Sequence, residues 1–442
     1  MKNKVLIIGA ARSGIAVAKL LHRHNYDVVI TDQNKIKEKK MLEALGITVY
    51  DQGHPEVLYA IDWTFIVKNP GIPYKVPFVS YFVKKQVKIY TEIEIGYWFA
   101  KKFHYAAVTG TNGKTTITTV LYEMLKKNKN ALVAGNIGYP LSEVVLEHEL
   151  EEKNVAIELS NFQLLGIETF APTVSTVCNL APDHLDYMES LESYYISKMK
   201  IYENCKEDAW FIRNVDDEVL FQYAKNIPCR CIDISMKHKN CDVYREQGKI
   251  MFHDICLFLE NDVKIPGEYN LMNLSMSAIM AYRMGVSIEN IQETIRNFYG
   301  IEHRMEYVAE YHQVRFYNDS KATNSHALQA ALQAFEGNII LLAGGHDKGI
   351  SFDDLNIYNH KVKICCAFGQ TKNKFQSVFT NVILCDDMKQ AFEQAIHLAK
   401  PNDIVLLSPG CSSYDQFKNY EERGLIFKQF VKEYIDKGEH IC

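Results

Sequence analysis

The sequence predicts an α/β protein with three domains, each built around a mostly parallel sheet. Two apolar strands, residues 4–8 and 105–108, each run into a glycine-containing loop and then into a helical pattern. From residue 299 onward, units of strand, loop and helix repeat along the chain. Such alternation is typical of parallel sheets covered by helices, and 442 residues can accommodate three domains.

The N-terminal strand leads into the turn Gly9-Ala-Ala-Arg-Ser-Gly14, and a second strand at residues 26–31 ends at Asp32. This βαβ start resembles a dinucleotide fold, but Ala11 stands where a second glycine would let the backbone approach a pyrophosphate. Asp32 can hold a ribose or another polar group. The turn therefore predicts a nucleotide-type ligand, and a purely structural βα turn is the alternative.

A later strand of the same domain ends in Asn69-Pro-Gly71, and open α/β sheets bind ligands at such strand ends. The pattern of residues 91–104 is helical. We place the Rossmann-like first domain at residues 1–93.

The most informative stretch is Thr109-Gly-Thr-Asn-Gly-Lys-Thr-Thr116, which joins a strand to a helix. Backbone N–H groups and the helix dipole favour phosphate at such a junction. Lys114 can reach the β- and γ-phosphates, and the Thr115 hydroxyl can ligate Mg²⁺. The loop departs from the usual P-loop pattern because Val108 replaces the first glycine. A strand–turn–helix without phosphate binding is the alternative.

Three further polar clusters follow in the predicted central domain, residues 94–298. Glu158 ends an apolar strand, so its carboxylate can reach a cation held by the loop. His184 lies in Asp183-His-Leu-Asp186, which is otherwise explained as a capped turn. Lys198 lies on a helix, where a lysine ordinarily faces solvent. Several short strands between residues 228 and 265 predict a small β excursion.

The C-terminal domain, residues 299–442, has polar loops at three strand ends: residues 318–324, 343–349 and 408–424. One such loop would be unremarkable. Three in one domain predict a shared site along the carboxyl edge of its sheet.

Composition excludes several classes of protein. The formal net charge is −5 without a long basic run, which disfavours nucleic-acid binding. No apolar stretch approaches the ~20 residues that span a bilayer, and the start lacks the apolar core of a signal peptide. The 11 cysteines include no C-x-x-C pair, so we expect reduced thiols in a cytoplasmic protein.

Taken together, the motifs closely resemble the Mur ligase family. They occur in the family's order and cover almost the whole chain: Thr109–Thr116, Glu158-Leu-Ser-x-Phe-Gln163, Asp183-His-Leu-Asp186, Lys198-x-x-Ile-Tyr202, Glu302-His-Arg304, Asp319-Ser-Lys-Ala-Thr-Asn324 and Gly344-Gly-x-x-Lys-Gly349. Within the family, residues 408–424 resemble the member that adds D-glutamate. The resemblance implies a UDP-sugar domain, a central ATPase domain and a C-terminal Rossmann-like domain.

The resemblance also implies a reaction. ATP would phosphorylate the carboxylate of UDP-N-acetylmuramoyl-L-alanine, and the amine of D-glutamate would displace the phosphate. ATP and two Mg²⁺ ions would be the cofactors, the substrates would be small molecules, and we expect a monomer.

Residue roles carried over by this resemblance fall into four groups. ATP would be bound by Gly110, Thr111, Asn112, Gly113, Lys114, Thr115, Thr116, Asn270, Arg304, Asp319 and Lys321. The UDP-sugar would be bound by Ser13, Gly14, Asp32, Asn69, Gly71, Asn136 and His184. D-glutamate would be bound by Thr323, Lys348, Ser413 and Tyr420. The catalytic residues would be Lys114, Glu158, His184 and Lys198. The metal ligands would be Thr115, Glu158, His184 and a carbamylated Lys198.

Other readings remain open at this point. A sibling ligase of the superfamily, such as folylpolyglutamate synthase, would share the loop and the modified lysine. An NAD(P)-dependent oxidoreductase would use the N-terminal turn, although Ala11 argues against it. A nucleotide-binding regulatory module without chemistry is a further alternative. The presence of Glu158, His184 and Lys198 argues against it.

Overall fold

The computed structural model describes residues 3–182, 188, 190–347, 349 and 351–438. Residue contacts divide the chain into two compact units. Unit 1 comprises Met1–Glu260 and Met272–Ile295, and unit 2 comprises Asn261–Leu271 and Arg296–Cys442. The domain boundaries after residues 93 and 298 stay predictions.

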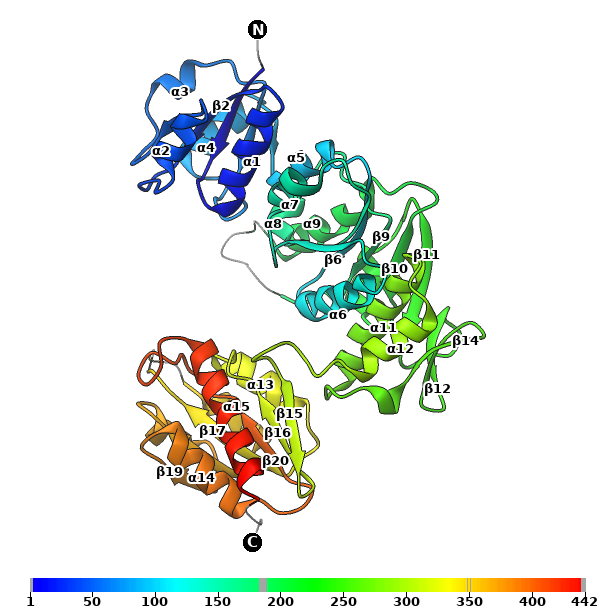
Figure 1. The fold of residues 1–442 in the computed structure, drawn as a ribbon, viewed down its shortest axis with the longest axis vertical. Helices are drawn as coiled ribbons and strands as arrows, with labels where there is room; N and C mark the ends of the chain where they lie inside the picture. Colours follow the sequence, from blue (N-terminus) through cyan, green and yellow to red (C-terminus); the bar gives the residue numbers. More distant parts are fainter. Residues whose placement is uncertain (1–2, 183–187, 189, 348, 350, 439–442) are drawn as a thin grey trace. The chain divides into compact units, whose positions relative to one another are not determined.

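Unit 1 begins with a five-stranded parallel sheet of order β3-β2-β1-β4-β5, drawn in blue in Figure 1. The strands are β1 (Lys4–Ile8), β2 (Asp27–Thr31), β3 (Thr48–Tyr50), β4 (Phe65–Lys68) and β5 (Ile89–Tyr90). The helices are α1 (Arg12–Arg23), α2 (Lys39–Ala44), α3 (Val57–Ala60) and α4 (Pro77–Lys84). β1 is an apolar run because both faces of the sheet are covered. The Rossmann-like prediction is confirmed.

The second sheet of unit 1 has nine strands in the order β14-β13-β12-β11-β10-β9-β6-β8-β7. The strands are β6 (Phe103–Thr109), β7 (Ala131–Gly135), β8 (Lys153–Glu158), β9 (Val174–Val177), β10 (Trp210–Asn214), β11 (Arg230–Ser235), β12 (Val243–Glu246), β13 (Lys249–Phe252) and β14 (Ile255–Leu259). Neighbours are parallel from β7 to β12, and β12, β13 and β14 pair antiparallel. These last strands belong to the predicted β excursion.

Helices flank this larger sheet (Figure 1). They are α5 (Glu92–Phe99), α6 (Lys114–Lys126), α7 (Leu141–His148), α8 (Asn161–Leu164), α9 (Leu191–Glu203), α10 (Glu218–Tyr223), α11 (Glu268–Arg283) and α12 (Ile288–Arg296), with a 3-10 turn at Glu260–Asp262. Helix α1 packs against α5 and α7, so the first sheet is joined to the second within unit 1.

Unit 2 contains a six-stranded sheet of order β15-β16-β20-β17-β18-β19, in which only the β15–β16 pair is antiparallel. The strands are β15 (Glu306–Tyr311), β16 (Val314–Asn318), β17 (Ile339–Gly344), β18 (Val362–Phe368), β19 (Val382–Leu384) and β20 (Ile404–Leu407). The helices are α13 (Ser325–Gln333), α14 (Met388–Leu398) and α15 (Tyr420–Lys437), with 3-10 turns at Asp353–Tyr358 and Lys372–Ser377. Apolar clusters fill both faces of this sheet.

One predicted element differs from the structure in its extent. The helical pattern of residues 91–104 ends earlier, because α5 stops at Phe99 and β6 begins at Phe103. No proline separates the two elements, so the sequence offers no clear stop signal. None of the described helices combines the length and apolar character needed to cross a membrane.

Candidate active site

The loop between β6 and α6 depends on two glycines with positive φ angles. Gly110 has a φ of +142°, and a Cβ there would lie 2.9 Å from the Cβ of Cys178. Gly113 has a φ of +85° and caps α6, and a Cβ there would lie 2.6 Å from Oδ1 of Asn273. Both positions therefore require glycine, as the sequence pattern predicts. Val108 is fully buried in β6, which explains why the loop starts later than in the usual pattern.

Asn179, which follows β9, fixes the shape of this loop. Its backbone carbonyl accepts a hydrogen bond from the N–H of Thr111 at 3.0 Å. Its side chain accepts from the N–H of Asn112 at 2.9 Å and donates to the Asn112 carbonyl at 3.0 Å. These N–H groups are occupied, so an anion would be met by the first turn of α6, whose N–H groups have no partner within the helix.

Two lysine side chains converge on one backbone carbonyl of the loop. Nζ of Lys114 and Nζ of Lys198 each donate to the Gly110 carbonyl, both at 2.9 Å. Lys198 is only 1% exposed, and its Nζ lies 4.5 Å from the ring centroid of Tyr194. The helical lysine thus does not face solvent. Two amines beside a helix N-terminus favour a strongly anionic ligand.

Glu158 ends β8, next to the loop, because Val108 and Glu158 are paired in register. The carboxylate is 1% exposed, and its Oε1 accepts a hydrogen bond from Nδ2 of Asn136 at 2.8 Å. Its Oε2 is buried without a hydrogen-bond partner among the described residues. A buried carboxylate oxygen without a partner is costly, so this atom fits a cation.

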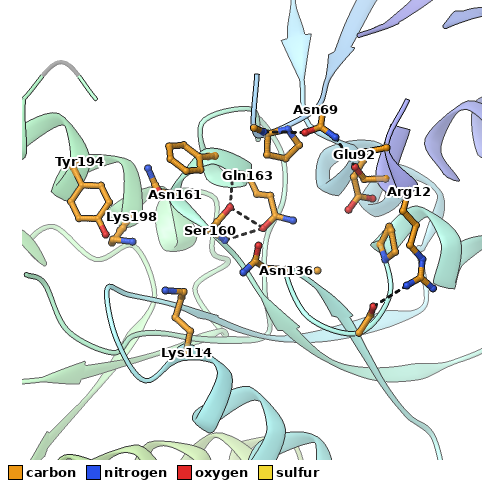
Figure 2. A pocket seen from close by; sticks show the side chains of 18 residues that line it. Arg12, Asn69, Glu92, Lys114, Asn136, Ser160, Asn161, Gln163, Tyr194 and Lys198 are labelled. Atoms are coloured by element: carbon orange, nitrogen blue, oxygen red, sulfur yellow. Dashed lines mark hydrogen bonds between the residues drawn. The ribbon is translucent and has the colours of Figure 1, made fainter. Parts of the chain in front are cut away.

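Lys114, Lys198 and Asn136 meet the turns of the first sheet around a cavity of about 560 Å³. Figure 2 shows the side chains that line it. It is lined by Ala11, Arg12, Ser13, Asn69, Pro70, Gly71, Glu92, Lys114, Gly135, Asn136, Gly138, Pro140, Ser160, Asn161, Phe162, Gln163, Tyr194 and Lys198. The structure thus brings Ser13, Asn69 and Gly71 together with Asn136, Lys114 and Lys198. The volume is typical of a small-molecule site.

Two predicted residues of the first sheet support the turn instead of lining this cavity. Both carboxylate oxygens of Asp32 accept backbone N–H groups, from Ala10 at 2.7 Å and from Asn34 at 2.8 Å. Gly14 packs against the same turn, since a Cβ there would lie 1.9 Å from the Gly9 carbonyl oxygen. Their first role is therefore to fix the turn.

In unit 2, the polar loops that follow β16, β20 and β17 lie at adjacent strand ends, because these three strands are neighbours and parallel. Asp319 follows β16 and is 5% exposed. Its carboxylate accepts from Oγ of Ser408 at 2.8 Å and from the N–H of Met305 at 3.2 Å. Burial raises the pKa of the Asp319 carboxyl to about 7, against the opposing effect of these hydrogen bonds.

Of the other predicted residues of unit 2, Lys321 lies near the start of α15. Nζ of Lys321 lies 5.8 Å from the ring centroid of Tyr420, and the Lys321 N–H donates to the His303 carbonyl at 2.9 Å. Ser413 is buried, and Arg304 is exposed. Thr323 is half-buried in the same loop as Lys321, and Asn270 donates to the Pro266 carbonyl at 2.6 Å.

His184 and Lys348 lie outside the described residues, so their predicted roles stay predictions. Within the described part of the chain, no group of three His, Cys, Asp or Glu side chains could hold a metal ion. Sequence reasoning missed several residues that line the cavity, among them Arg12, Glu92 and Asn161. Arg12 carried a signal in its place inside the glycine turn, and Asn161 in its place inside the Glu158–Gln163 motif, whereas Glu92 carried none.

Comparison with known proteins identifies the family. The family model described as "Mur ligase middle domain" matches residues 108–281, and "Mur ligase, glutamate ligase domain" matches residues 303–411. A protein of Geobacillus sp. (strain WCH70), named UDP-N-acetylmuramoylalanine--D-glutamate ligase, is 40% identical over 437 residues, which cover 96% of each chain. The chain belongs to the Mur ligase family. The family prediction is therefore confirmed.

Further relatives agree over the whole length of this Mur ligase. A protein of the same name from Listeria monocytogenes serotype 4b (strain F2365) is 37% identical, covering 99% of this chain and 98% of its own. Among solved structures, MurF ligase from Thermotoga maritima in complex with ADP has a TM-score of 0.56 at 17% identity. That match covers 92% of this chain and 95% of the other, and it supports the three-domain Mur ligase fold. Mur ligases are ATP-dependent enzymes.

Proposed function

We propose that this Mur ligase joins D-glutamate to UDP-N-acetylmuramoyl-L-alanine and converts ATP to ADP and phosphate. The names of the full-length relatives support the substrates. The observation that carries the chemistry is the position of the Lys114 amine, which donates to the Gly110 carbonyl at the N-terminus of α6. A cation beside a helix N-terminus suits the phosphates of a nucleotide.

The reaction needs an activated carboxylate, because a carboxylate is a poor electrophile at neutral pH. An oxygen of the substrate carboxylate attacks the γ-phosphorus of ATP, and ADP leaves. The amine nitrogen of D-glutamate then attacks the carbonyl carbon of the acyl phosphate. The tetrahedral intermediate loses phosphate together with the former carboxylate oxygen, and the nitrogen loses a proton. The protein mainly positions the reactants and offsets charge.

In this proposal the loop residues Gly110–Thr116 bind the phosphates of ATP, and Lys114 neutralises charge on the γ-phosphate. Mg²⁺ would supply electrostatic stabilisation of the phosphates when bound. Thr115 and Glu158 would hold one ion, and the unpartnered Oε2 of Glu158 fits that role. His184 and a carbamylated Lys198 would hold a second, since addition of CO₂ to the amine, with loss of a proton, gives a carbamate with anionic oxygen ligands.

The remaining roles are divided between the two units. Ser13, Gly14, Asp32, Asn69, Gly71, Asn136 and His184 would bind the UDP-sugar. Asn270, Arg304, Asp319 and Lys321 would contact the nucleotide of ATP, and His303 would support them. Thr323, Lys348, Ser413 and Tyr420 would bind the carboxylates of D-glutamate. We further expect the protein to act as a monomer in the cytoplasm.

A phosphate-release assay with Mg·ATP, UDP-N-acetylmuramoyl-L-alanine and single amino acids tests the proposal. The panel contains D-glutamate, L-glutamate, L-lysine and meso-diaminopimelate. We expect turnover with D-glutamate alone. Turnover with another amino acid would keep the ligase chemistry and overturn the substrate, and no turnover with any of the four would contradict the proposed function.

A further inference from the structure

A buried lysine lies directly beside the cavity and takes no part in the proposed chemistry. Lys68 is the last residue of β4 and is 1% exposed. Its Nζ donates to the carbonyl of Asn69 at 3.0 Å and to the carbonyl of Ile72 at 2.7 Å. The same nitrogen lies 4.5 Å from the ring centroid of Tyr74. One amine therefore holds both ends of the turn that follows β4.

This turn carries residues that line the cavity. Oδ1 of Asn69 accepts the N–H of Gly71 at 3.0 Å, and Nδ2 of Asn69 donates to Oγ of Ser13 at 3.3 Å. The turn also packs tightly on the neighbouring one, since a Cβ at Gly9 would lie 2.7 Å from the Cβ of Asn69. Asn69, Gly71 and Ser13 all line the cavity, and Figure 2 shows Asn69 beside it. Any shift of the Asn69 turn thus changes the cavity wall.

Packing alone does not explain a lysine at this position. Lys68 lies on the same face of β4 as Ile66, and that face is covered by an apolar cluster that includes Phe78 and Val79. An unbranched apolar side chain would suit such surroundings without the cost of burying an amine. Burial lowers the pKa of the Lys68 amine to about 8, which reflects that cost. What the amine adds is a fixed distance between two backbone carbonyls.

We propose that Lys68 is a positioning residue for the UDP-sugar: it fixes the Asn69–Ile72 turn so that Asn69 and Gly71 meet the nucleotide end of that substrate. The inference rests on the proposed function for the identity of the ligand. It concerns the uridine diphosphate portion alone, so the ATP and D-glutamate steps do not depend on it.

The test compares Lys68→Met with Lys84→Met, an exposed lysine at the end of α4. Calorimetric titration with UDP measures binding without turnover, and kinetics give KM for each substrate. In Lys68→Met we expect the Kd for UDP and the KM for UDP-N-acetylmuramoyl-L-alanine to rise about tenfold, as for a lost charge-assisted hydrogen bond. The KM values for ATP and D-glutamate should stay within about twofold, and Lys84→Met should match the wild type in all of them.

Other results would overturn the inference. A folded Lys68→Met protein that binds UDP as tightly as the wild type would overturn it. An equal rise in the KM values for all three substrates would overturn it as well. If Lys68→Met does not fold, Tyr74→Leu removes the ring beside the amine and should raise the Kd for UDP about two- to threefold. An unchanged Kd in that variant would also contradict the role. Failure of the wild type to bind UDP would instead count against the proposed function.

Discussion

Two turns of unit 1 have the same strand–turn–helix construction and opposite electrostatics. The turn after β1 is tied by the carboxylate of Asp32, which accepts the N–H of Ala10. The turn after β6 is tied by the neutral amide of Asn179, and two lysine amines donate to its Gly110 carbonyl. Asp32 thus adds negative charge behind the first turn, and Lys114 adds positive charge to the second.

The difference shows that a glycine turn before a helix does not by itself define a phosphate site. Both helices offer N–H groups at their first turns. The β6 turn adds the Lys114 cation and suits a triphosphate, whereas Asp32 at the β1 turn disfavours close approach of a phosphate. Neutral hydroxyl and amide groups of a nucleotide suit the β1 turn better. We therefore propose that ATP binds at the second turn and the UDP-sugar at the first.

Lys114→Ala should have the largest effect, because it removes a cation from the second turn alone. We expect at least a thousandfold loss of ATP turnover, with unchanged circular dichroism and unchanged binding of UDP. Phosphate release and calorimetry measure the two effects. Lys126→Ala, near the other end of α6, is the matched control and should keep full activity. Turnover near the wild-type rate in folded Lys114→Ala would remove the basis for the comparison.

Lys198→Ala should cost about a hundredfold in turnover and tests the chemical form of the second amine. If Lys198 acts as a carbamate, short carboxylic acids added to the assay should restore part of the rate, because they supply the missing anionic oxygens. Lys200→Ala on the same helix should keep its rate and show no response to these acids. A folded Lys198→Ala enzyme with an unchanged rate would show that the carbamate reading is wrong.

Asp32→Asn should have a smaller effect that is confined to the first turn. An amide NH₂ would face one of the two N–H groups that the carboxylate now accepts. We expect KM for the UDP-sugar to rise about fivefold while KM for ATP is unchanged. Asp27→Asn, in β2, serves as the control. A rise in the KM for ATP of the same size would contradict the separation of the two turns.

Asp319 extends the comparison to unit 2, where a buried carboxyl has its pKa raised from 3.8 to about 7. Between those values the folded state holds more protons than the unfolded state, so the free energy of unfolding falls as pH rises through this window. Asp319→Asn should lack that slope and unfold at a temperature a few degrees higher than wild type above pH 7. Asp354→Asn, at an exposed position, should keep the slope. Parallel pH profiles of Asp319→Asn and wild type would contradict the account.

Much of the fold followed from local patterns. Apolar runs such as Lys4–Ile8 end in polar or glycine loops, so their places were predictable. β15 (Glu306–Tyr311) was not predicted, because its side chains are mostly half-buried and give no clear apolar run. The glycines of the β6 turn were predictable for a related reason, since their backbone conformation restricts the residue type.

The pairings inside the site were not predictable from sequence, because they join residues far apart in the chain. Asn179 lies about 67 positions from the loop residue Asn112 that it ties. Lys68 looked like an ordinary charge at a strand end, and its burial follows only from the turn that folds over it. The local sequence around Asp32 likewise gave no sign that backbone N–H groups occupy both of its carboxylate oxygens.

An isotope-transfer experiment tests directly whether ATP activates the substrate carboxylate. The carboxylate oxygens of UDP-N-acetylmuramoyl-L-alanine are labelled with ¹⁸O, and the released phosphate is analysed by mass spectrometry after turnover with D-glutamate. An acyl phosphate transfers one labelled oxygen to each phosphate, and we predict that ratio. Unlabelled phosphate formed together with the amide product would contradict the account.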